Sequence, residues 1–374
     1  MTTEPTTTLP QPESTAQPKP VAKKRWTWLP VALLLIGIIA FGAYFRFGGL
    51  DWAEGNSLHP DEYFLMGVTS NVQLPKDLGE YFDSQNSPLN PYNKGAGTFV
   101  YGDLPLFMTR FTAEALDAAC KMNESLCLKK DGAPYPFASY QGIQLWGRAL
   151  SGLLDLFTLI FMFFIGKRLY NVKVGLLAAA LGAATVLQIQ QSHFYTSDVF
   201  ATFFVAAALF FIIRLGDTFS WFDTVAAGAA SGLAVASRIN VAPIVGILAV
   251  ALFVPVISRW RDPQHKATIE SAVARLVVAG IVALLVFRIF MPYAFDGLLR
   301  LDDRWMANMN TVQRLNSGED PGGPPGIQWS DRTPLVFPWI NIVFWGMGLP
   351  LGLAAWIGWA WAAWQTFVTP YLKR

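Results

Sequence analysis

Eight apolar runs limit what this sequence can fold into more than any other feature. A run of about 17 to 25 apolar residues is long enough for a helix to cross the hydrocarbon core of a bilayer. Only 14% of the residues are charged and the mean hydropathy is +0.35, whereas a soluble domain carries about 25% charged residues. The sequence therefore predicts an all-α polytopic membrane protein with about eight transmembrane helices. The runs lie at residues 28–47, 143–165, 174–192, 197–213, 221–237, 239–257, 270–290 and 337–364.

Basic residues near these runs predict which side of the membrane each loop faces. Lys23, Lys24 and Arg25 precede the first run, which has no small-residue cleavage site and is interpreted as an uncleaved anchor. Because short cytoplasmic loops are rich in Lys and Arg, both termini are predicted to lie in the cytoplasm (N-in/C-in) of a cell-membrane protein. The predicted organisation is a disordered tail (1–26), a first span (27–47), a long outer loop (48–142), spans two to seven (143–290), a second outer loop (291–336) and a last span with a short cytoplasmic end (337–374).

The charge balance and the rare residue types exclude several classes of protein. The 28 basic and 26 acidic residues leave a net charge of +2, which is too small for a nucleic-acid binder that neutralises phosphates. The two cysteines exclude a disulfide scaffold and a thiolate zinc cluster. The three histidines leave little room for a His-rich metal site. Cys120 and Cys127 both fall in the long outer loop, where they are expected either to form a local disulfide in an oxidising compartment or to remain free thiols.

The string His59-Pro60-Asp61-Glu62 opens one of two helices, at about 61–72 and 104–120, that are expected to lie at the membrane surface. Proline in the first turn followed by two acids is a favourable helix start, because acids there meet the positive end of the helix dipole. The string is explained equally well by a carboxylate at the water–lipid boundary that acts as a general base on a hydroxyl. Both interpretations stay open from the string alone.

A second polar string, from Gln191 to Asp198, joins two predicted spans on the same outer side. Asp198 could simply cap the following helix. His193 and Asp198 nevertheless stand at the membrane boundary, where polar side chains are costly unless they are paired or face water. We therefore expect Asp61, Glu62, His193 and Asp198 to converge on one cavity.

Three outer cations are candidates for holding an anion. Lys94 stands in a Gly-bearing turn ahead of Tyr101, where backbone N–H groups and a point charge can approach an anion, although a plain surface loop explains it too. Arg238 lies where two short spans meet and could equally be a snorkelling anchor. Arg332, in the second outer loop, could hold a phosphate. None of these strings matches a Walker or dinucleotide-binding motif.

Several further positions have two interpretations. Tyr293 and Trp329 return to the outer side, where they are expected either to stack on a sugar ring or to anchor the chain at the interface. Arg148 and Asp155 lie on one face of the second span. They are expected to form a structural ion pair, because a carboxylate at that depth must pair or face water.

These motifs resemble the GT-C glycosyltransferases, most closely the dolichyl-phosphate-mannose–protein mannosyltransferase branch that includes the lipid A aminoarabinose transferases. The resemblance implies a polyprenyl phosphate carrying one sugar as the donor, with Asp61 as the base and Glu62 beside it. It further implies that Lys94 and Arg238 hold the donor phosphate, while Asp198 positions acceptor or sugar. Family members commonly have more spans, so a short member, a partner chain and an incomplete sequence are all open. The motifs that carry the resemblance are His59–Glu62, Lys94 ahead of Tyr101–Leu106, Gly147–Ser151, Gly166–Tyr170 and Ser192–Asp198.

The sequence thus predicts a glycosyltransferase in the lipid bilayer that moves one sugar, with inversion, from a polyprenyl-phosphate donor to a hydroxyl of a protein, lipid or glycan on the extracytoplasmic side. A phosphate leaves as a stable anion, so one carboxylate and nearby cations suffice. A lipid or solute transporter and a non-catalytic assembly subunit are the alternatives. No nucleic acid and no cofactor are expected, and a divalent metal is left open. The candidate residues are Asp61, Glu62 and Asp198 (catalytic), Lys94, Arg238 and Arg332 (donor phosphate), and His59, His193, Tyr101, Tyr293 and Trp329 (substrate).

Overall fold

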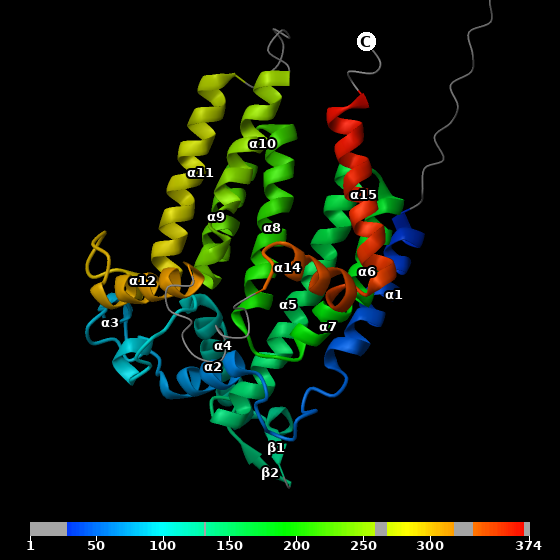
Figure 1. The fold of residues 1–374 in the computed structure, drawn as a ribbon. Helices are drawn as coiled ribbons and strands as arrows, with labels where there is room; N and C mark the ends of the chain where they lie inside the picture. Colours follow the sequence, from blue (N-terminus) through cyan, green and yellow to red (C-terminus); the bar gives the residue numbers. More distant parts are fainter. Residues whose placement is uncertain (1–27, 131, 259–267, 318–331, 370–374) are drawn as a thin grey trace, which may run out of the picture.

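The computed structural model describes residues 28–130, 132–258, 268–317 and 332–369, and these are mostly helical. Long helices stand side by side, and shorter helices gather at one end of this bundle, which we call the α2–α4 end (Figure 1). The expected all-α membrane fold is confirmed. The described strands, β1 (Leu128–Lys130) and β2 (Ala133–Tyr135), pair as one antiparallel hairpin at the tip of the α2–α4 end (Figure 1).

Five described helices are long and apolar enough to cross a membrane, and a sixth span results if one bent pair is counted. The expected count of eight is therefore not confirmed. The bent pair is α6 and α7, which meet at Thr185 at an angle of 59° and replace the single span expected at 174–192. The five helices are α1 (Trp28–Phe47), α5 (Tyr140–Leu169), α8 (Ser197–Thr218), the segment Ile239–Ile257 and α11 (Ile269–Phe290), and the bent pair consists of α6 (Val172–Ala184) and α7 (Val186–Ser192).

Two expected spans differ in detail from the structure. The span expected at 239–257 begins with a 3₁₀ turn, η3 (Ile239–Val241), before α10 (Ile244–Ser258), while α9 (Trp221–Ser237) has the expected bounds. The run expected as one span at 337–364 consists of α14 (Val336–Ile340), the π-helical segment η5 (Asn341–Gly346) and α15 (Leu349–Phe367). Gly348 separates the last two with φ at +78°, a conformation that favours glycine.

A buried ion pair closes the break between α6 and α7. A helix end leaves carbonyl oxygens without partners, and in a bilayer such groups must be satisfied by the protein. Here Arg46 of α1 donates to the carbonyl oxygens of Gly182 (3.2 Å) and Ala183 (3.1 Å), and its Nε pairs with Asp155 of α5. Both charged side chains are buried. The bend is therefore supported by a residue that lies far away in the sequence.

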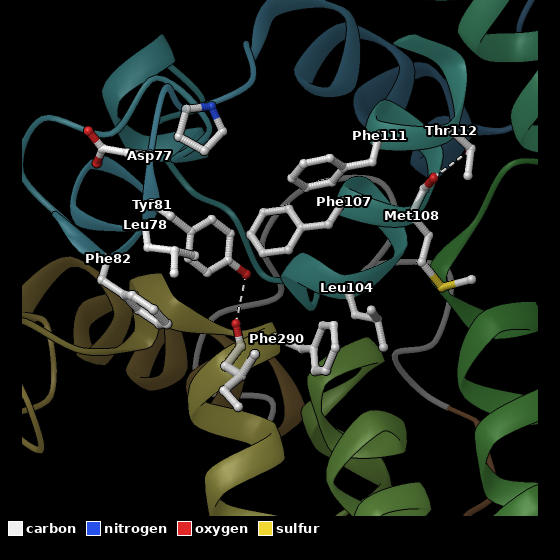
Figure 2. A pocket seen from close by; sticks show the side chains of 12 residues that line it. Asp77, Leu78, Tyr81, Phe82, Leu104, Phe107, Met108, Phe111, Thr112 and Phe290 are labelled. Carbon is white, nitrogen blue, oxygen red and sulfur yellow. Dashed lines mark hydrogen bonds between the residues drawn. The ribbon is translucent and has the colours of Figure 1, made fainter. Parts of the chain in front are cut away.

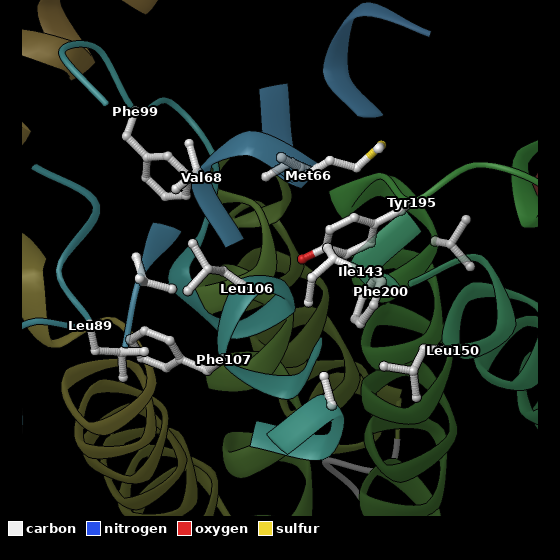
Figure 3. Close-up of a cluster of buried hydrophobic side chains, with 14 of the residues drawn as sticks. Met66, Val68, Leu89, Phe99, Leu106, Phe107, Ile143, Leu150, Tyr195 and Phe200 are labelled. Carbon is white, nitrogen blue, oxygen red and sulfur yellow. The ribbon is translucent and has the colours of Figure 1, made fainter. Parts of the chain in front are cut away.

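The α2–α4 end consists of short helices that pack on the ends of the long ones. Helices α2 (Pro60–Asn71) and α4 (Asp103–Met122) confirm the two helices expected at 61–72 and 104–120. Buried apolar side chains from α2, α4, α5 and α8 join this layer to the bundle, among them Met66, Phe107, Ile143 and Phe200 (Figure 3). The remaining short elements are α3 (Leu78–Phe82), η1 (Pro91–Lys94), η2 (Glu124–Leu126), η4 (Pro292–Ala294) and α12 (Asp303–Ser317).

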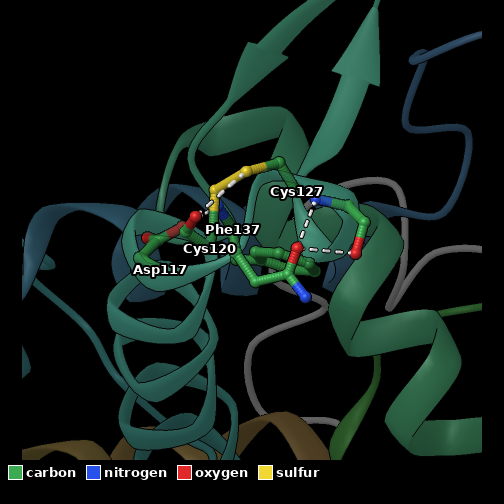
Figure 4. The surroundings of a disulfide bond; sticks show 6 residues. Asp117, Cys120, Cys127 and Phe137 are labelled. Atoms are coloured by element: carbon green, nitrogen blue, oxygen red, sulfur yellow. Dashed lines mark hydrogen bonds between the residues drawn. A yellow bond between two sulfur atoms is a disulfide. The ribbon is translucent and has the colours of Figure 1, made fainter.

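A disulfide between Cys120 and Cys127 ties the end of α4 to the hairpin (Figure 4), which decides between the two states expected for these residues. Asp117, one turn earlier in α4, accepts hydrogen bonds from the backbone N–H groups of Phe137 (2.6 Å) and Ala138 (3.0 Å). The two links hold the hairpin and the start of α5 against α4.

Candidate active site

Asp61 lies in the first turn of α2, with its side chain half-buried. The helix starts here because Pro60 has a fixed φ suited to the first turn and because His59 caps it, its ring Nδ1 accepting from the N–H of Asp61 (3.2 Å). Tyr101, from another segment, lies close enough for the charge of Asp61 to raise the pKa of its phenol. Asp61 is thus positioned by its helix next to Tyr101, while part of it stays accessible.

Gly102 brings Tyr101 to the end of α9. Its N–H donates to the carbonyl oxygen of Ser237 (3.2 Å). A Cβ at this position would stand 2.0 Å from the carbonyl oxygen of Ala236, closer than any side chain allows. Only glycine permits this approach, so the loop before α4 lies directly on the backbone that leads to Arg238.

Asp198 and Arg238 form an ion pair at the same place. Asp198 stands in the first turn of α8, and Arg238 is the residue that ends α9. Both side chains are partly exposed. A guanidinium has five donors, so Arg238 can pair with Asp198 and still donate to an anion.

Asp61, Asp198 and Arg238 all lie close enough to Tyr101 to affect the pKa of its phenol. Burial raises this pKa, and so do the charges of Asp61 and Asp198, while Arg238 lowers it. We call Asp61, Tyr101, Asp198 and Arg238 the Asp61 cluster. It gathers two carboxylates, a phenol and a cation from four separate segments. Of the four residues expected to share one cavity, Asp61 and Asp198 belong to this cluster, whereas Glu62 and His193 have other partners.

Glu62, expected to act beside Asp61, is instead a buried structural residue. Its two carboxylate oxygens each accept from Arg148 (2.7 Å from Nε and 2.7 Å from Nη2), and one also accepts from the backbone N–H of Tyr195 (2.9 Å). Glu62 and Arg148 are both fully buried. The expected pairing of Arg148 with Asp155 is wrong, because Arg148 pairs with Glu62 and Asp155 with Arg46.

Two candidate phosphate ligands lie apart from one another. Lys94 lines a hollow of about 220 Å³ with Tyr63 and Asn71 of α2, and Asp61 is not among the lining residues. Arg332 is exposed and lies over the ring of Phe337 near the start of α14. Their roles in binding phosphate stay predictions.

The candidate substrate residues other than Tyr101 have structural partners or lie outside the description. His193 places Nδ1 2.8 Å from the carbonyl oxygen of Ile189 and Nε2 3.0 Å from that of Gly48. The expectation that Tyr293 stacks on a sugar is contradicted, since its ring is buried and its hydroxyl bonds to Ser87 (2.8 Å). Trp329 lies outside the described residues. No group of three or more His, Cys, Asp or Glu side chains in the described ranges is arranged to hold a metal ion.

Two hollows at or near this end were not expected. One, about 590 Å³, is almost wholly apolar and lies between α3, α4 and the end of α11, lined by residues such as Phe107 and Phe290 (Figure 2). The other, about 470 Å³, contains Asp198 and is lined by polar and apolar groups of α5, α7 and α8. Gln191 opens the second polar string of the sequence, but no motif marked Gln188, because a glutamine in an apolar run carries no signature of its own.

Asp103 is a further residue that the sequence did not single out. It is buried at the start of α4, and its Oδ2 has no partner among the described residues. Burial raises the pKa of Asp103 to about 8, and a backbone hydrogen bond from Tyr293 opposes this only in part.

Residues 144–291 match the model of the dolichyl-phosphate-mannose-protein mannosyltransferase family. The chain resembles these mannosyltransferases. The matched part contains Asp198 and Arg238, whereas Asp61 and Tyr101 precede it. The expected resemblance to GT-C glycosyltransferases is thereby confirmed.

A solved structure shows the same fold. It is a chain of the S. cerevisiae protein O-mannosyltransferase Pmt1–Pmt2 complex bound to the sugar donor, with a TM-score of 0.51 and 19% sequence identity. The match covers 73% of the present chain and 35% of the yeast chain, so the present chain corresponds to about a third of that protein. No curated protein sequence matches this chain.

Proposed function

We propose that this protein is a membrane glycosyltransferase that moves one sugar from a polyprenyl-phosphate donor to a hydroxyl acceptor. The observation that carries the proposal is the Asp61 cluster, in which carboxylates and a guanidinium from distant segments meet at one end of a GT-C membrane fold. The yeast neighbour is described as an O-mannosyltransferase bound to its sugar donor. A dolichyl-type phosphate donor and a protein acceptor follow from that likeness.

The cluster has the groups that this reaction needs. Asp61 takes the proton of the acceptor hydroxyl as that oxygen attacks the anomeric carbon. Arg238 stabilises the charge of the departing phosphate, and Lys94 and Arg332 are further candidates for this task. Because phosphate leaves as an anion, no acid is needed to protonate it. A single direct displacement inverts the configuration at the anomeric carbon.

The disulfide supports an extracytoplasmic position of the α2–α4 end. Disulfides persist in oxidising compartments and are rare in the cytosol, and the Cys120–Cys127 bond lies in this layer. The basic residues before α1 predict a cytoplasmic N-terminus, which places the opposite end of α1 outside. Both observations support the proposal that the Asp61 cluster faces the outer side.

The test is sugar transfer by purified Asp61→Asn protein with a radiolabelled polyprenyl-phosphate hexose. Loss of a general base should lower the rate about 10²- to 10⁴-fold. The control is Asp83→Asn, because Asp83 is an exposed loop residue whose Oδ1 accepts from the N–H groups of Gln85 and Asn86, and asparagine keeps that acceptor. Full activity of the Asp61 variant would contradict the assignment. Movement of the labelled lipid across vesicles without a covalent product would instead favour a transporter.

A further inference from the structure

A polar cavity opens beside the Asp61 cluster, between α5, α7 and α8. Its volume of about 470 Å³ lies in the range of about 300 to 1,000 Å³ typical of small-molecule sites. We call it the α7 cavity. Five of its seven lining residues are polar, although apolar atoms make up most of the exposed wall. It is lined by Asp155, Leu187, Gln188, Gln191, Asp198, Val199 and Thr202.

The bend between α6 and α7 lies beside this cavity. Interrupted backbone at membrane depth is tolerated only where it is buried in protein or lines a water-filled space. In membrane proteins such discontinuous helices commonly form the binding sites of polar ligands. Here Arg46 satisfies the carbonyls that the bend frees, and Asp155, its partner, is also a wall of the cavity. The protein thus stabilises the interruption with a buried ion pair, and the space beside it is preformed.

The lining favours a neutral ligand rich in hydroxyl groups. The lining contains two carboxylates and no lysine or arginine, which disfavours a phosphate. The same carboxylates and the two glutamines disfavour an apolar lipid chain. Amides and carboxylates supply both donors and acceptors for hydroxyls. The Oε1 atom of Gln188 is buried and has no partner among the described residues. It can therefore accept a hydrogen bond from a hydroxyl group of a ligand.

We propose that the α7 cavity binds the sugar of the lipid-linked donor and that Gln188 and Gln191 determine which sugar is accepted. The proposal rests on the function proposed above. Asp198 belongs both to the cavity and to the ion pair with Arg238. In the donor a single oxygen joins the sugar to the phosphate. A phosphate on Arg238 therefore places its sugar at the mouth of the cavity, with the anomeric carbon facing the cluster.

The first test measures binding without catalysis. Both native cysteines are engaged in the disulfide, so Gln188→Cys introduces a single free thiol into the cavity. A small methanethiosulfonate reagent should label it at least tenfold more slowly with polyprenyl-phosphate hexose than with sugar-free polyprenyl phosphate. Gln190→Cys is the matched control, because Gln190 is exposed on the same helix and outside the cavity. Its labelling should not depend on the sugar. If the first variant does not fold, Gln191→Cys takes its place.

The second test is kinetic. Gln188→Ala should raise the KM for the hexose donor about three- to tenfold, since one or two hydrogen bonds are lost. Inhibition by sugar-free polyprenyl phosphate should stay unchanged. Equal weakening of both lipids, or equal protection of Cys by both, would overturn the sugar site. Protection by the hexose donor in a protein that transfers no sugar would keep this site and refute the proposed function instead.

Discussion

Replacing Asp103 by asparagine should make the protein more stable at neutral pH and remove part of the pH dependence of its stability. Burial raises the pKa of Asp103 to about 8, whereas an aspartate in the unfolded chain titrates near ~3.9. Between these two values the folded protein binds a proton that the unfolded chain has released. The stability that this proton provides is complete below about pH 4 and falls as the pH rises towards 8. Asparagine keeps the acceptor for the Tyr293 N–H and cannot ionise.

The size of the effect follows from the linkage slope. One proton taken up in the folded state changes the free energy of unfolding by about 1.4 kcal/mol per pH unit. The difference between Asp103→Asn and the parent should therefore grow by about 2.7 kcal/mol from pH 5 to pH 7. Subtracting the parent cancels the histidines, which titrate in both proteins. The pKa values of Tyr81, Tyr92 and Tyr293, raised mainly by burial, keep these neighbours neutral throughout.

The assay is denaturant unfolding in mixed micelles, followed by tryptophan fluorescence at four pH values. Asp302→Asn is the opposite control. Burial works to raise the pKa of Asp302, but hydrogen bonds from Arg304 and Ser84 lower it overall. A lowered pKa stabilises the folded protein above about pH 4 and is lost on acidification, so this variant should lose stability at neutral pH. Parallel pH profiles of Asp103→Asn and the parent would refute a protonated Asp103.

Two further changes test the packing that positions the site. Arg46→Met should destabilise the protein by about 3 to 5 kcal/mol because it leaves Asp155 buried and unpaired. Adding Asp155→Leu should restore part of the lost stability, as measured by unfolding in micelles. A further loss of stability in the double variant would contradict the pairing. Gly102→Ala should lower transfer activity about 10²-fold, because the new Cβ must push the loop that carries Tyr101 off the backbone of Ala236. Gly37→Ala, in a helix with open space around its Cβ position, should leave the rate unchanged.

The apolar runs predicted most long helices to within a few residues, because a bilayer demands a fixed length of apolar helix whatever the neighbours are. They did not predict the bend at Thr185. The residues from 174 to 187 are apolar except for Thr185, and the bend is supported by Arg46, which reaches it from α1 and donates to the carbonyls of Gly182 and Ala183. Local composition cannot reveal a cap that a distant residue supplies.

For the candidate site, the sequence could predict which residues lie at the same end of the helical bundle. Asp61, Asp198 and Arg238 were each expected on the outer side, and they lie in one cluster at the α2–α4 end. Tyr293 was also expected there, but its ring packs inward with Phe107 and Tyr81. The membrane side of a residue follows from counting spans, whereas the direction of its side chain depends on the packing of its element.

Asp61 and Glu62 show most clearly how packing separates residues that look alike in the sequence. Successive residues on a helix point about 100° apart, so two neighbouring acids cannot both face the same partner. Arg148 belongs to α5, which packs against one side of α2. It donates to both carboxylate oxygens of Glu62. That contact fixes the rotation of α2 about its own axis and turns Asp61 towards Tyr101. The buried acid, Glu62, thus sets the direction in which the accessible acid, Asp61, points.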